Sequence, residues 1–179
     1  MKHSIYFVLS LLFAFTYFGC KNSDTDITSP GTNNISTVDR SRPFNGNATG
    51  IARDDSGPGC ISPWTHQEVT GTGTATHIGL YHAVTHDCYL TTSTSGGLTN
   101  NGTGTLTAAN GDEINVTYSG SYTFNAWPPT SANFVLNVTI IGGTGRFQNA
   151  TGSFTAYAVE DLTQYPKPFT LSWTGTISY

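Results

Sequence analysis

Apolar and polar residues alternate along several short segments of this chain. The clearest case is Phe134 to Ile141, in which every second residue can enter a core while its neighbours face solvent. No segment shows a sustained helical period, and clusters of Gly, Asn and Pro separate the alternating runs. The pattern predicts about eight strands, near residues 43–53, 65–76, 78–90, 103–109, 112–124, 132–141, 151–160 and 168–178.

The segment Gly142 to Phe154 joins two of these predicted strands. Its glycines allow the positive φ angles that a tight reversal needs. Phe147 is apolar within this turn, so we expect it to fold back and plug one end of the core. The alternative is an ordinary hairpin in which Phe147 has no such role. Arg146 in the same turn is expected to bond loop carbonyls, the alternative being an anion site.

A meander of eight strands protects its edges best by closing on itself. The sequence therefore predicts an all-β fold, an antiparallel up-and-down eight-stranded β-barrel. Such a barrel has an interior wide enough for side chains or for one small ligand. The residues expected to line it are Ile114, Val116, Tyr118, Phe134, Leu136, Val138, Phe154 and Trp173.

The beginning of the chain reads as a targeting segment. Residues 1–19 have a short basic start and an apolar run that is too short to span a membrane. Gly19-Cys20 resembles the lipobox of bacterial lipoproteins, which implies lipidation of Cys20, for example by palmitate, and anchoring to the outer membrane of a bacterial envelope. The alternative is secretion with an unmodified Cys20. Residues 20–42 are polar and predict a flexible tether, so the barrel domain is expected at 43–179.

Charge is sparse, with 7 Lys and Arg against 11 Asp and Glu. From Ser56 onward the only Lys or Arg residues are Arg146 and Lys167, which argues against nucleic acid as a partner. With Cys20 assigned to lipid, Cys60 and Cys88 remain. In an oxidising compartment this pair predicts a disulfide that pins a long loop to the sheet, the alternative being two free thiols.

One polar constellation lies between residues 66 and 87 and comprises His66, Glu68, His77, His82, His86 and Asp87. His82 and His86 share a face of a predicted strand, and so do His66 and Glu68. Two histidines and a carboxylate from neighbouring strands form a conceivable metal site, for which His82 and His86 are the candidate ligands. The alternative is a solvated face of strand histidines, and no cofactor is expected.

The turn Gly142-Gly143-Thr144-Gly145-Arg146-Phe147, followed by Ala150-Thr151-Gly152, resembles the signature of the dirigent and allene oxide cyclase-like barrel families. Two further segments, 71–79 and 107–112, resemble bacterial members with a cyclase-like barrel. The resemblance implies an eight-stranded barrel that is often oligomeric, so a homo-oligomer is an expectation too. The catalytic residues of the plant enzymes have no counterpart that can be matched in this sequence.

The function expected from these features is a lipid-anchored barrel that is non-catalytic or binds a small apolar ligand. Tyr118, Phe134, Phe154 and Trp173 are the candidate ligand-binding residues. One alternative is a cyclase or isomerase acting on an apolar intermediate, which needs an ionisable group inside the barrel; the candidates are Glu113, Glu68 and Glu160. A surface adhesion or complex-subunit role is a further alternative. Whether the barrel is hollow or filled separates these hypotheses.

Overall fold

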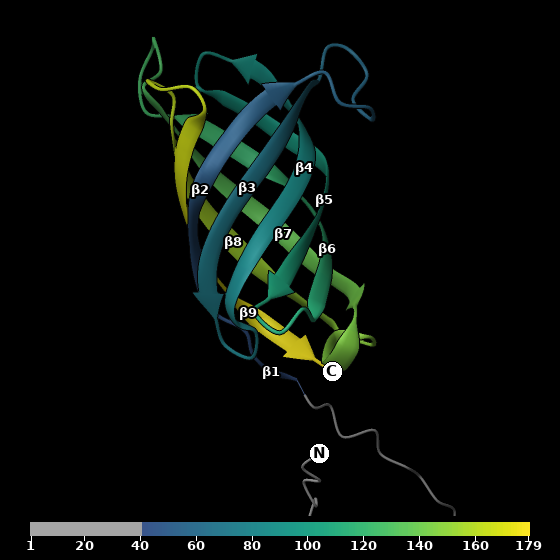
Figure 1. The fold of residues 1–179 in the computed structure, drawn as a ribbon. Coiled ribbons are helices and arrows are strands. Elements are labelled where there is room, and N and C mark those ends of the chain that lie inside the picture. Colours follow the sequence, from purple (N-terminus) through teal and green to yellow (C-terminus); the bar gives the residue numbers. More distant parts are fainter. Residues whose placement is uncertain (1–40) are drawn as a thin grey trace, which may run out of the picture. The chain divides into compact units, whose positions relative to one another are not determined.

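Residues 41–179, described here from a computed structural model, form an antiparallel β-barrel (Figure 1). Each of the eight long strands pairs with its neighbours in sequence, and β9 pairs with both β8 and β2, which closes the sheet. A short strand, β1, adds to β9 outside this ring. The strands are β1 (Arg42–Pro43), β2 (Gly46–Asp55), β3 (Thr65–Ala75), β4 (Gly79–Ser93), β5 (Gly96–Ala108), β6 (Glu113–Phe124), β7 (Ser131–Gly143), β8 (Thr151–Asp161) and β9 (Lys167–Ser178).

The predicted all-β fold and its closure are thus confirmed, and most strand boundaries agree within a few residues. The main error concerns β5, which begins at Gly96 instead of residue 103. Gly96 and Asn101 both have positive φ angles, and the pairing of β5 with β6 shifts between Thr99 and Gly102. A bulge of this kind breaks the alternation on which the prediction depended.

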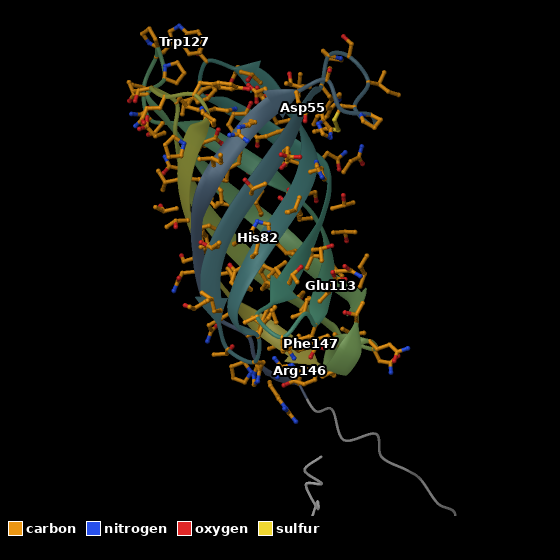
Figure 2. All side chains as sticks on the ribbon, viewed as in Figure 1. Asp55, His82, Glu113, Trp127, Arg146 and Phe147 are labelled. Carbon is orange, nitrogen blue, oxygen red and sulfur yellow. A yellow bond between two sulfur atoms is a disulfide. The ribbon has the colours of Figure 1, made fainter. Side chains whose placement is uncertain are left out.

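Two ends of the barrel differ in how they are closed. The end formed by turns 76–78, 109–112 and 144–150 is called the plugged end, and the end formed by loops 56–64, 94–95, 125–130 and 162–166 is called the loop end. Figure 2 shows Phe147 and Arg146 at the plugged end, and Asp55 and Trp127 at the loop end. The only helical element among residues 41–179 is the one-turn η1 (Gly145–Phe147), and no helix there is long and apolar enough to cross a membrane.

Phe147 closes the plugged end, as the sequence predicted. Its side chain is fully buried, and its ring centroid lies 5.0 Å from that of Tyr179. Phe44, between β1 and β2, is a second plug that the sequence did not reveal; it is also fully buried and meets the Phe154 ring at 5.6 Å. Burial of two phenylalanines is worth several kcal/mol, and both rings belong to the packed core at this end.

Arg146 has a structural role, but not the one expected. Its guanidinium lies over the Phe147 ring at 4.7 Å, and Nε lies 3.5 Å from Asp112 Oδ2. The arginine therefore covers the plug and pairs with a carboxylate across the neighbouring turn, where loop carbonyls had been predicted as its partners.

A disulfide joins Cys60 to Cys88, as predicted from the sequence. Cys60 lies in loop 56–64, and Cys88 lies on β4, so the bond fixes this loop against the sheet at the loop end. Because it closes 28 residues of chain, it restricts the unfolded state and stabilises the fold.

Candidate functional site

The barrel is hollow above its plugs. A cavity of about 120 Å³ occupies the interior, and its wall is mostly apolar. All four candidate ligand-binding residues line it, together with Val116, Leu136 and Val138. Ile114 was also expected in the wall; it is fully buried and belongs to the packed core instead. Strand parity therefore placed seven of the eight expected lining residues correctly.

The cavity exists because small residues oppose large ones. On β2 and β8 the inward positions carry Ala48, Ala52, Ala156 and Ala158, whereas β6, β7 and β9 supply the aromatic and branched residues. These alanines leave the interior with less side-chain volume than close packing needs. Beneath Trp173 the interior is filled, because Gly46 lies so close to the indole ring that a Cβ there would clash with it.

A carboxyl group and a phenol meet inside the barrel. Tyr118 Oη on β6 donates to Asp87 Oδ2 on β4 at 2.9 Å, and Thr85 Oγ1 lies 3.1 Å from the same phenol oxygen. Strand β5 lies between these two strands, and a Cβ on its Gly102 would lie 2.4 Å from the Tyr118 ring. Glycine at this position therefore lets the phenol cross β5 and reach the carboxylate.

The buried carboxylate of Asp87 has few groups around it that would stabilise its negative charge. The residue is 6% exposed, and among residues 41–179 its Oδ1 has no hydrogen-bond partner. Burial raises the pKa of Asp87 from 3.8 to about 6; the Tyr118 hydrogen bond lowers it, and the charge of Glu160 raises it further. Burial, with the nearby Asp87 charge, also raises the pKa of the Tyr118 phenol well above its ordinary value.

A second buried carboxyl belongs to Glu160, which is 4% exposed at the loop end of β8. Lys167 Nζ lies 3.2 Å from Glu160 Oε1 and donates to Asp54 Oδ1 at 2.8 Å. The contact with Glu160 is an ion pair without hydrogen-bond geometry, because Oε1 accepts no hydrogen bond from the described residues. Burial raises the pKa of Glu160, and Lys167 opposes that shift.

These groups form a polar tier between the apolar cavity and the loop end. We use this name for Asp54, Gln67, Asp87, Tyr118, Glu160 and Lys167. Gln67, 4% exposed, pairs in register with Asp87 on the neighbouring strand and with Asp54 on the other side. The tier holds three carboxyl groups and one ammonium group, so its neutralisation within the barrel is incomplete.

Of the three glutamates proposed from the sequence as interior acids, one faces the barrel interior and two face outward. Glu160 faces the interior and lines the cavity. Glu113 lies on the outer face of β6, next to buried Ile114, and Glu68 lies on the outer face of β3, next to buried Gln67. Neither is therefore positioned to act on a ligand in the cavity.

Asp87 was missed as an interior acid because it had been grouped with the histidines. The signal was available, since Tyr81, Ala83, Thr85 and Asp87 alternate along β4 and all four line the cavity. The sequence could not reveal that Tyr118, two strands away, holds this carboxylate.

The histidines lie on the outside of the barrel. His82 is exposed midway along β4 (Figure 2). His86 lies on the same face of β4, four residues nearer the loop end. The His86 ring stacks on that of His66 at 5.5 Å, and His66 Nδ1 bonds Asp55 Oδ1. Within residues 41–179, no group of three His, Cys, Asp or Glu side chains is arranged to hold a metal ion, so the predicted pair gains no further ligand.

Comparison with known proteins assigns no family to this chain. A scan against protein-family models and a search of curated protein sequences found no match for this chain. The cavity and the polar tier are therefore the features from which function is inferred.

Proposed function

We propose that this protein is a ligand-binding barrel of the bacterial envelope, carried by a lipid anchor at Cys20, and that its ligand is a small, largely apolar molecule. The single observation that carries the binding proposal is the hollow interior. An apolar cavity of about 150 Å³ in another protein takes up benzene, so a space of this order accepts a ring of about six heavy atoms.

The composition of the wall supports this proposal. Ligand sites are typically apolar with a few convergent polar groups, and here aromatic and aliphatic side chains surround the space while the polar tier bounds one end. A barrel with only a structural role gains nothing from an empty interior, because unfilled volume forfeits packing contacts.

Anchoring and family remain proposals that rest on the sequence. Residues 1–19, Cys20 and most of the tether lie outside the described residues. The closed eight-stranded barrel agrees with the fold that the dirigent and allene oxide cyclase-like resemblance implies, and it supports membership of that superfamily. Mass spectrometry of the exported protein tests the anchor, since acylation adds a fixed mass to the Cys20 peptide and Cys20→Ser removes it.

Calorimetric titration with toluene and benzyl alcohol tests the binding proposal. We expect saturable binding of both probes, at a ratio of one per barrel. Ala156→Leu fills the cavity from the β8 wall and is expected to weaken binding at least tenfold. Val159→Leu, on the outer face of the same strand, is the matched control and should leave affinity unchanged. Absence of saturable binding, or full binding by Ala156→Leu, would refute the proposal.

A second candidate is acid catalysis on an apolar intermediate, as in a cyclase or isomerase. The observation that favours it is Asp87 beside Tyr118 in the cavity wall, because a carboxyl whose pKa lies near 6 remains able to donate a proton in weak acid. Styrene oxide is a suitable probe, since protonation of its oxygen opens the ring and isomerisation yields an aldehyde. Asp87→Asn should abolish turnover; turnover at the uncatalysed rate with the wild-type protein would exclude this function for such substrates.

A further inference from the structure

We infer that the ligand is a small apolar amine, whose ammonium group binds at the Asp87 carboxylate while its hydrocarbon part fills the cavity. This inference rests on the proposed binding function and goes beyond it by naming the chemistry of the ligand. It follows from an incomplete hydrogen-bond set, from the balance of charge in the polar tier and from the position of both relative to the apolar wall.

The hydrogen bonds of the Asp87 carboxylate are incomplete within residues 41–179. One carboxylate oxygen is held by Tyr118, and the other, Oδ1, has no donor within the described residues. A buried acceptor without a partner costs stability, and native structures seldom retain one without a reason. Asp87 lines the cavity, so a donor on a bound ligand is placed to supply the missing partner.

The charge of the polar tier is not balanced. The groups that act on Asp87 are Tyr118 from β6, Glu160 from β8, Lys167 from β9 and, from the outer face of β3, His66. Lys167 is shared between Asp54 and Glu160, so no cation within residues 41–179 pairs directly with Asp87. A ligand ammonium would bring the tier close to neutrality, whereas a ligand carboxylate would add a fourth negative group.

The wall of the cavity defines the shape of a suitable ligand. The Asp87 carboxylate and the Tyr118 phenol line the same cavity as the aromatic side chains of β7 and β9, which lie three strands from β4 in each direction. A ligand that satisfies both regions has one charged donor end and one compact hydrocarbon end. Benzylamine has this form, and its six-membered ring matches the apolar space.

The experiment compares benzylamine with benzyl alcohol, which has the same shape without the charge. At about pH 8 we expect the wild-type protein to bind the amine about tenfold more tightly, because a charge-assisted hydrogen bond is roughly twice as strong as a neutral one. Asp87→Asn should bind both probes with equal affinity. Glu68→Gln removes one negative charge from the outer face of β3 and is the matched control; it should retain the preference for the amine.

A pH series on the wild-type protein gives an independent test that needs no variant to fold. The amine remains charged throughout, so its advantage over the alcohol should disappear at about pH 4.5 as the carboxyl takes up a proton. Equal binding of the two probes at high pH, or an equal loss of preference in Glu68→Gln, would overturn the amine proposal while leaving the binding function intact. If neither probe nor toluene binds, the proposed function fails as well.

Discussion

Replacing Asp87 by asparagine should stabilise the protein relative to wild type, and this gain in unfolding free energy should be larger at neutral pH than in acid. The native state holds this carboxyl at a pKa of about 6, against 3.8 for an unperturbed group. Between these values the native protein binds more protons at Asp87 than the unfolded chain does. The free energy of unfolding therefore falls as pH rises through this window, and it stops falling above about pH 6.

The magnitude follows from the shift. About two pKa units, at roughly 1.4 kcal/mol each, amount to about 3 kcal/mol of stability lost on ionisation. Asparagine has nearly the same shape, accepts the Tyr118 hydrogen bond and does not ionise. The difference in unfolding free energy between Asp87→Asn and wild type should therefore grow by about 3 kcal/mol between about pH 3.5 and about pH 7.5.

Urea denaturation followed by tryptophan fluorescence, repeated across this pH range, measures the difference. Comparison with wild type removes the contributions of Glu160, Asp55 and the other titrating groups common to both proteins. Glu68→Gln is again the control, and its difference from wild type should stay within about 0.5 kcal/mol at every pH. A difference for Asp87→Asn that is flat with pH would refute the conclusion that burial of this carboxylate opposes folding.

Three further changes test the framework around the site. Phe147→Ala removes the plug and should lower the free energy of unfolding by about 3–5 kcal/mol, measured in urea. Joint replacement of Cys60 and Cys88 by serine should cost about 3–4 kcal/mol, and reductant should reproduce that loss in the wild-type protein but leave the variant unchanged. Lys167→Met leaves Glu160 buried without its cation and should destabilise by about 3–5 kcal/mol, and adding Glu160→Leu should recover most of that loss. Recovery by less than a third would indicate that Lys167 acts mainly through its other contacts.

Local pattern was sufficient for most of the barrel. In β7 the alternation from Ala132 to Ile140 predicts the inward face, because the strand period is two and one face must be dry. Glycines and an apolar residue in the turn predicted the plug formed by Phe147. The start of β5 could not be predicted in this way, since Gly96 and Asn101 adopt positive φ angles in a segment with little apolar content.

Local periodicity and residue type were enough to predict most strand boundaries, the inward face of β7, the disulfide and part of the apolar wall. Tertiary structure alone decided whether the barrel is hollow, since cavity volume is a sum over side chains from all eight strands. It also decided the partner of Asp87. Tyr118 lies 31 residues away and reaches the carboxylate across β5 at Gly102, a contact set by the pairing of β4, β5 and β6 that no spacing in the chain records.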